Sequence, residues 1–288
     1  MWYEGQSGGP SYPRPQKKQS MEQLKQWRLA APFVAVVERF VEIDGATHGG
    51  VMSIQFFTTV IPLIIIGFAH FSGFAAHASV GDLFIRALGL QHPFDDRVRD
   101  AFGDSSGIKS VWTFFGVATF LVWGIPMSIN VASIFGQAWR RPPFGTTEKL
   151  TRGAVWFLLF LETMSVHGRI GFAGQHGAGV RALLLVVGFV PVWIFWALTP
   201  VLLVRDVGRG WRTLLLVGLA GALIDGVLFA VIRVGFPILL EGWTGFGPIG
   251  VAMTLMTWCG VLATGWVVIA CTGAIVSERH AVTARKSV

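Results

Sequence analysis

The 288-residue chain has little charge for its size. Charged residues make up 14% of it, against about 25% in ordinary soluble domains. With so few charges it cannot cover its surface as a soluble globular enzyme does. The same composition excludes a disordered chain and a soluble nucleic-acid binder, because residues of the hydrophobic class make up 53%.

Cysteine and the common catalytic motifs are also scarce. The only two cysteines, Cys259 and Cys271, lie about 18 Å apart along one apolar helix, too far to pair. The seven histidines form no His-x-x-x-His pair, and no Gly-x-Ser-x-Gly or phosphate-binding Gly-Lys-Ser/Thr motif occurs. We therefore expect no metal, no cofactor and no enzymatic activity. No soluble nucleic-acid partner is expected either.

Long apolar runs are what the chain has instead. A membrane-spanning helix needs about 20 predominantly apolar residues. Six segments meet this requirement, which predicts an all-α bundle of six transmembrane helices in one membrane domain, 20–280. The expected spans are 49–73, 110–136, 152–168, 182–204, 213–239 and 249–276.

The basic residues predict the orientation of these spans. Sixteen of the 23 Lys and Arg residues lie in the two tails and in the second and fourth loops, whereas six lie in the other loops. Cytoplasmic loops collect Lys and Arg, so both termini are expected in the cytoplasm. Residues 1–19, rich in Gly, Pro and Ser, predict a disordered basic tail, and 281–288 a short C-terminal tail.

Two segments outside the spans have alternative interpretations. Residues 20–42 place apolar residues at near-helical spacing, with Pro32 expected to break or kink the helix. This amphipathic segment lies either on the membrane surface or against the cytoplasmic end of the bundle. The long external loop, 74–109, forms either a small helical cap or a binding lid.

Two segments near the start of the membrane domain follow a recognisable pattern. In the first span, the run Gln55–Pro62 is similar to an aromatic–Ser–x–x–Pro pattern, with Thr59 in place of the serine. At the end of the second span, Ala132–Trp139 followed by Arg-Arg-Pro looks like an Ala–Leu–Asn–x–Ile–Trp…Arg segment, with Gly136 in place of the asparagine.

A third segment completes the pattern in the sixth span. Phe246–Gly250, followed by Trp258 and Gly273–Ala274, resembles Tyr–Gly–Ser–Leu–Gly…Leu–Trp…Gly–Ala–Glu, with Ile275 in place of the glutamate. In order and spacing, the three segments resemble the YihY/BrkB family of six-span bacterial inner-membrane proteins over roughly residues 30–280.

The resemblance implies a multi-pass protein of the bacterial inner membrane, of a family described as transporters or virulence-associated membrane proteins. Older labels for some family members name a tRNA ribonuclease. The cytoplasmic loops of this chain offer mostly Arg and Lys rather than acid–base or metal chemistry, so that activity is not expected. Any role of the glutamate replaced by Ile275 is lost or moved elsewhere in this chain.

Polar residues inside the expected spans need an explanation, because lipid offers them no hydrogen bond. We expect them to face inward, either along a solute or lipid pathway or as hydrogen bonds between helices. Threonines of the sixth span, Thr254 and Thr257 among them, favour the second interpretation. The candidate pathway residues are Gln55, Asn130, Glu162, Asp225 and Arg233.

Three further groups of residues predict contacts with lipid or with other helices. Tryptophans near span ends are expected at the membrane interface: Trp112, Trp139, Trp156, Trp211 and Trp243. Small residues on one face of the fifth span predict close helix packing: Gly218, Gly221, Ala222 and Gly226. Basic residues at the cytoplasmic ends are candidates for lipid head-group binding: Arg140, Arg141, Arg205 and Arg212.

These patterns support two hypotheses of different kinds. The first is a transporter or lipid-handling protein with an inward polar cavity. The alternative is a non-catalytic membrane scaffold for envelope assembly, with a dry interior and a protein partner. An intramembrane enzyme acting on lipid would need a second carboxylate or a histidine near Glu162.

Overall fold

The computed structural model describes residues 31–71, 85, 94–96, 109–171, 178–207 and 210–286, and these residues form helices and short turns without a strand. The all-α class predicted from the sequence is therefore confirmed for this part of the chain. The long helices are α2 (Ala31–Glu42), α3 (Gly45–Phe71), α6 (Lys109–Ala138), α7 (Thr146–Gly171), α8 (Ala178–Leu203), α9 (Trp211–Gly242) and α10 (Pro248–Lys286), with a 3-10 turn, η1 (Thr244–Phe246), before α10.

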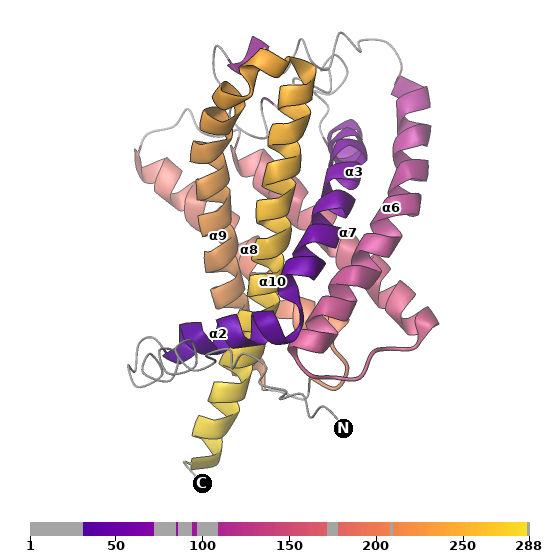
Figure 1. Ribbon diagram of the computed structural model, residues 1–288. Coiled ribbons are helices and arrows are strands. Elements are labelled where there is room, and N and C mark those ends of the chain that lie inside the picture. The colour runs from indigo at the N-terminus through magenta and orange to yellow at the C-terminus, as the bar shows by residue number, and fades with distance from the viewer. Residues whose placement is uncertain are drawn as a thin grey trace, which may run out of the picture.

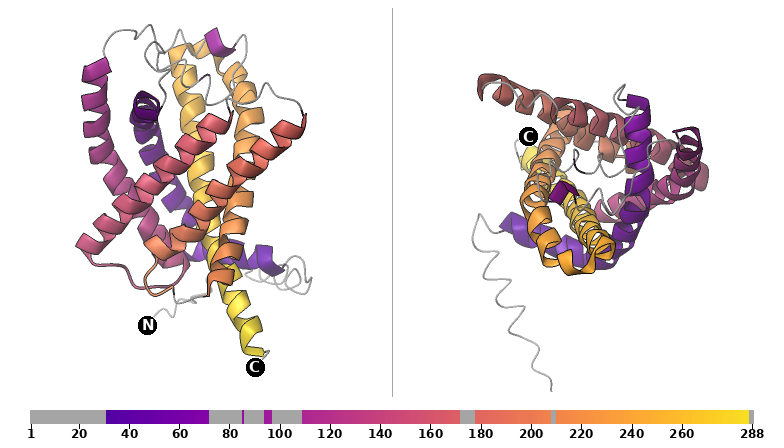
Figure 2. Two further views of the ribbon diagram at one scale, coloured as in Figure 1. Left: turned by 180° about the vertical axis from the view of Figure 1, so that it is seen from behind. Right: turned by 90° about the horizontal axis from the view of Figure 1, so that it is seen from above.

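Six helices pack side by side in a closed ring that follows the order of the chain. Each of α3, α6, α7, α8 and α9 contacts the next, and α10 closes the ring by packing against both α9 and α3. The view along the bundle in Figure 2 shows α10 between α9 and α3. Helix α2 lies across one end of the bundle, below α3 and α10 in Figure 1. We refer to this end, which also carries the α6–α7 and α8–α9 loops, as the α2 end.

Within the described residues, three helices contain segments long and apolar enough to cross a membrane, which is the composition of a membrane protein. They are Val186–Leu203 in α8, Trp211–Gly242 and Ile249–Ala281. The exposed surface of these helices supports the same conclusion, because it is apolar. On α9, for example, Leu223, Val227 and Val234 face outward from the bundle. Such a surface is unfavourable in water and favourable in lipid.

Helix α2 has an unusual distribution of polar and apolar side chains. Its exposed face carries Phe33, Val37 and Val41, which we call the apolar stripe, whereas its buried face carries Val34 and the charged Arg39. The helix packs on α3 and α10, as one of the two interpretations of this segment predicts. The outward apolar stripe is what the other interpretation, a membrane surface, requires.

The helix ends differ from the expected span limits for a common physical reason. Helix α7 begins at Thr146 rather than near residue 152, and α10 continues through Lys286 into the expected C-terminal tail. Charged residues such as Glu148 and Arg152 form helix as readily as apolar ones. A helix can therefore continue beyond the apolar run that the sequence reveals, and the end of the run does not mark the end of the helix. The disordered tail predicted for 1–19 and most of the external loop 74–109 lie outside the described residues.

Turns between the helices rely on left-handed backbone conformations. Asp44 between α2 and α3, Arg140 after α6 and Asp206 after α8 have φ of 53°, 52° and 50°. Aspartate tolerates this region better than most residues, and Gly247, with φ of 55° before α10, adopts it without strain.

Small residues let neighbouring helices approach closely. A Cβ atom at Gly218 of α9 would lie 2.6 Å from the Ala197 Cβ of α8, and one at Gly221 would lie 2.9 Å from the Trp196 Cβ. The small-residue face predicted on this helix therefore packs against α8 at these two positions. Gly226 does not belong to it, since a Cβ there would meet nothing within 4 Å.

We predict that Gly218→Ala destabilises the protein, because the added methyl must push α9 away from α8. Such overpacking costs roughly 1–3 kcal/mol and should lower the Tm measured by thermal unfolding in detergent micelles. Gly226→Ala adds the same methyl to the same helix in open space and should leave the Tm unchanged or slightly higher. Equal effects of the two substitutions would contradict the close α8–α9 contact.

Candidate functional site

Two of the candidate pathway residues meet between α3 and α6. The Asn130 side-chain amide donates a hydrogen bond from Nδ2 to Oε1 of Gln55, with 3.1 Å between the atoms. Both side chains are half-buried. This contact lies between two helices, so each amide satisfies part of its hydrogen-bonding capacity without water.

The polar contact between α3 and α6 continues toward the α2 end. His48 of α3 lies 3.2 Å from Gln137 of α6, measured from Nε2 to Oε1, and the Gln137 amide donates to Ser133 at 3.3 Å. Asn130, Ser133 and Gln137 thus share one face of α6, as their spacing of three and four residues requires in a helix. Among the threonines of α10, Thr254 and Thr257 instead donate to carbonyls of their own helix, so the expected hydrogen bonds to other helices are not made by these two hydroxyls.

Asp225 is the only candidate pathway residue that is fully buried, with 4% of its surface exposed. The indole N–H groups of Trp196 from α8 and Trp266 from α10 lie close to its carboxyl group. The Trp196 N–H lies outside good hydrogen-bond geometry, and no aligned acceptor meets it within the part of the chain that is described. Two helices on opposite sides of α9 therefore aim their polar ring atoms at one carboxyl group.

Aromatic rings fill the interior around these two tryptophans. Trp266 packs edge-on against four rings, those of Trp156, Phe56 at 4.8 Å, Phe160 at 5.2 Å and Trp196 at 5.4 Å between centroids. Trp156 lies 5.8 Å from Trp266 and donates its N–H to the Thr199 hydroxyl. We call these six side chains of α3, α7, α8 and α10 the aromatic core: Phe56, Trp156, Phe160, Phe195, Trp196 and Trp266.

The interface position predicted for some tryptophans is wrong. Trp156 is fully buried and Trp139 is 7% exposed, because each lies where helices cross rather than at the bundle surface. Trp211 is 67% exposed, as an interfacial residue requires. Tryptophan at a span end marks the membrane interface only if its side chain points outward, and sequence position does not reveal that direction.

The remaining candidate pathway residues lie apart from Asp225 and from each other. Glu162 of α7 is exposed, and so is Arg233 of α9, two turns beyond the buried Asp225. The structure thus brings together Gln55 with Asn130 and leaves the other three at separate places. Asp225 and Arg233 do not form an ion pair, because the rise of the helix separates them by about 12 Å along α9.

An ion cluster at the α2 end was not foreseen. Arg39 of α2, 3% exposed, donates to both carboxylate oxygens of Glu278 of α10, at 2.9 and 3.1 Å, and to the Ala138 carbonyl at the end of α6. Its Nε also lies 3.3 Å from Glu42. A buried guanidinium is stable only with such partners. The signal available in the sequence was a charged residue on the face of α2 that carries Val34.

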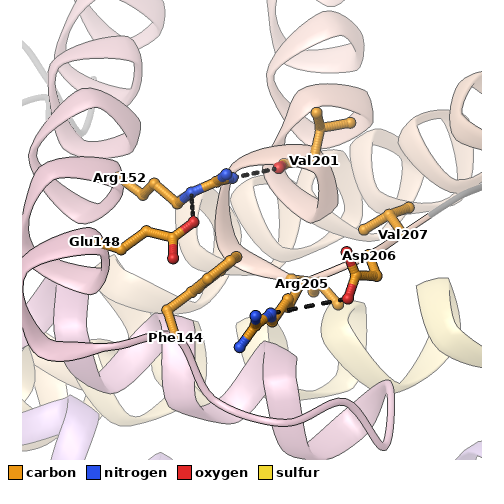
Figure 3. Close-up of a pocket in the computed structure, with 8 residues that line it drawn as sticks. Phe144, Glu148, Arg152, Val201, Arg205, Asp206 and Val207 are labelled. Atoms are coloured by element: carbon orange, nitrogen blue, oxygen red, sulfur yellow. Dashed lines mark hydrogen bonds and ion pairs between the residues drawn. The ribbon is translucent and has the colours of Figure 1, made fainter.

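The basic residues expected to bind lipid head groups have different surroundings. Arg140 is paired with Glu42. Its Nε donates to Oε1 of Glu42 at 2.9 Å, and its Nη2 donates to Oε2 at 2.6 Å. Arg141 and Arg212 are exposed, and Arg212 stacks 5.5 Å from the Trp211 ring. Arg205 lines a cleft of about 460 Å³ at the α2 end, shown in Figure 3.

One further hollow lies on the side of the bundle. A shallow groove of about 660 Å³ runs between α3, α9 and α10 and is lined mainly by glycine and aliphatic side chains, with Thr257 and Thr264 as the polar ones. Within the described ranges, no group of three His, Cys, Asp or Glu residues is placed to hold a metal ion. Cys259 and Cys271 are free and buried.

The Glu42–Arg140 contact predicts a pH dependence. The hydrogen bond from Arg140 lowers the pKa of the Glu42 carboxyl below its ordinary value of 4.5. A lowered folded-state pKa stabilises the fold above the ordinary value, and this contribution is lost as the pH falls through the lowered value. The Tm difference between wild type and Glu42→Gln should therefore be present at pH 7 and vanish toward pH 3.

Glu241→Gln removes an exposed carboxylate at the other end of α9 and serves as the control, with no such pH-dependent difference expected. A Tm difference for Glu42→Gln that stays constant between pH 7 and pH 3 would contradict the ion pair.

Comparison of the chain with protein-family models, with curated proteins and with solved structures found no match.

Proposed function

We propose that this protein is a six-span membrane transporter or lipid-handling protein of the YihY/BrkB type, with both termini in the cytoplasm. The observation that carries the proposal is the buried Asp225 between indole groups of α8 and α10. Carboxylates inside spanning helices are costly, and a membrane protein that retains one generally uses it for function. Protons, ions and polar head groups are the species that such a group meets.

The helix ring supports six spans in addition to the three most apolar helices. Helices α3, α6 and α7 have 27, 30 and 26 residues. At 1.5 Å per residue each is about 40 Å long, more than the roughly 30 Å thickness of a bilayer core. All six would run side by side with their ends on the same two surfaces. The basic residues at the α2 end favour the cytoplasm for that surface.

The polar residues of the interior give the proposal its pathway. Trp266 of the aromatic core neighbours both Asp225 and Phe56, the residue that follows Gln55 in α3. In this proposal, movement of the aromatic rings connects the two polar places during transport. Glu162 and Arg233, which are exposed, are secondary candidates.

We predict that Asp225→Asn keeps the fold and lowers transport at least tenfold, because asparagine fills the same space and cannot take up a proton. Purified protein would be reconstituted in vesicles with fluorescently labelled phospholipid in both leaflets. An impermeant quencher added outside then reports how fast inner-leaflet lipid reaches the outside. Protein-free vesicles give the background rate.

Glu241→Gln, an exposed carboxylate on the same helix, should transport at the wild-type rate, and Glu162→Gln should have a smaller effect than Asp225→Asn. Equal rates for wild type and Asp225→Asn, both above background, would overturn the role of Asp225. A wild-type rate equal to background would exclude lipid movement and favour the alternative function.

The alternative function is a membrane scaffold, which a specific observation favours. The aromatic core is tightly packed, with Trp156 fully buried and Trp196 2% exposed. A scaffold has such a dry interior permanently, whereas a transporter has it in only one of its conformations. Crosslinking in membranes should then capture a stable protein partner.

A further inference from the structure

The cleft at the α2 end is formed by three segments that are distant in sequence. Phe144 comes from the α6–α7 loop, Glu148 and Arg152 from the first turns of α7, and Val201–Val207 from the end of α8 and its following loop. Figure 3 shows the charged side chains around the opening. Its apolar lining is buried, with Phe144 8% and Val204 2% exposed. Its volume, about 460 Å³, is within the range of small-molecule sites.

Arg152 is held in place by three contacts inside the cleft. Its Nε donates to Glu148 at 2.9 Å, its Nη1 donates to the Val201 carbonyl at 3.3 Å, and its guanidinium stacks 4.5 Å from the Phe144 ring centroid. These contacts leave Nη2 without a partner among the described residues. A fixed guanidinium with an unused donor loses little entropy when it binds a phosphate.

Arg205 supplies a second guanidinium to the same cleft. Its Nε lies 3.8 Å from Asp206 Oδ2, longer than a hydrogen bond, and its side chain is 51% exposed. In the described part of the chain, its terminal nitrogens have no other partner. Asp206 is itself 81% exposed on a left-handed turn, so both side chains are available to a ligand.

The charges of the cleft favour one class of ligand. The cleft is lined by two guanidinium groups, those of Arg152 and Arg205, and by two carboxylates, those of Glu148 and Asp206. A purely anionic ligand would be attracted by the arginines and repelled by the carboxylates. A ligand that carries a phosphate and an ammonium group a few ångströms apart satisfies both pairs at once.

The level of the cleft indicates where such a ligand comes from. It lies where the apolar segment of α8 ends, at Leu203, and just before the apolar α9 begins, at Trp211. The exposed Trp211, with Arg212 against its ring, is the residue pair typical of the boundary between lipid and water. Phospholipid head groups lie at this boundary.

We propose that this cleft binds a phosphate–ammonium head group, that of phosphatidylethanolamine, with Arg152 and Arg205 on the phosphate and Glu148 and Asp206 on the ammonium. The inference rests on the membrane location in the proposed function and not on transport. A lipid held here would anchor α7 to the α8–α9 loop.

The test measures binding of short-chain lipids to the full-length protein in detergent micelles by native mass spectrometry. Dioctanoyl phosphatidylethanolamine should bind saturably, and Arg205→Gln should weaken it about tenfold, the worth of one charge-assisted hydrogen bond. Lys149→Gln removes a neighbouring positive charge outside the cleft and should not change the affinity. Arg205 makes no hydrogen bond within the described structure, so its substitution spares the fold.

A second pair of variants tests the recognition of the ammonium group. Asp206→Asn should reduce the preference for phosphatidylethanolamine over dioctanoyl phosphatidylglycerol, whereas Asp44→Asn, also exposed and also left-handed, should not. Glycerophosphoethanolamine, the soluble head group without acyl chains, is then added as a competitor for the cleft. If it displaces the lipid with the affinity of the lipid itself, the ligand is a soluble molecule of the same chemistry. If it does not compete, the ligand is the lipid.

Three results would overturn the proposal: no saturable binding, equal affinity of wild type and Arg205→Gln, or a lipid preference unchanged by Asp206→Asn. The binding measurement does not depend on lipid movement. The protein can therefore fail to transport lipid in vesicles and still bind it in this cleft, or transport lipid without binding it here.

Discussion

The closure of the helix ring by α10 is the contact that brings partners to two buried charged residues, Asp225 and Arg39. This helix packs against α3, the first of the ring, and α9, its predecessor in the chain. Trp266 brings an indole to Asp225, and Glu278 brings a carboxylate to Arg39. Without α10 in place, the carboxyl of Asp225 would lose one of its two indole neighbours, and the guanidinium of Arg39 would lose the carboxylate of Glu278. Ring closure and the neutralisation of buried charge are thus one structural event.

The charged residues at the α2 end fall into two groups with different surroundings. Arg39 is enclosed by Glu278, Glu42 and the Ala138 carbonyl, so its role is to join three helices. Arg205 faces an open cleft and has room for an external partner. At this end of the bundle, an enclosed guanidinium therefore joins helices, whereas a guanidinium in the cleft keeps unused donors.

The sequence predicted the helical class and the residues that share a helix face, because both follow from apolar length and from a period of 3.6 residues. It predicted that Gln55 and Asn130 turn inward, and the two amides do meet. It did not predict that Trp196 and Trp266 meet at Asp225, since no local pattern states which faces of α8 and α10 oppose each other. It missed Arg39 because one arginine in an amphipathic segment is normally solvent-exposed. These failures all concern contacts between residues far apart in the chain.

The apolar stripe of α2 has a mechanical consequence. With Phe33, Val37 and Val41 in the lipid interface, as the proposed topology places them, the helix floats at the membrane surface while Arg39 ties it to Glu278 on α10. A change in lateral pressure or curvature that shifts α2 then pulls on the helix that closes the ring. In the proposed topology the bilayer is thus mechanically coupled to the packing of the bundle, with the Arg39–Glu278 ion pair as one of the connections.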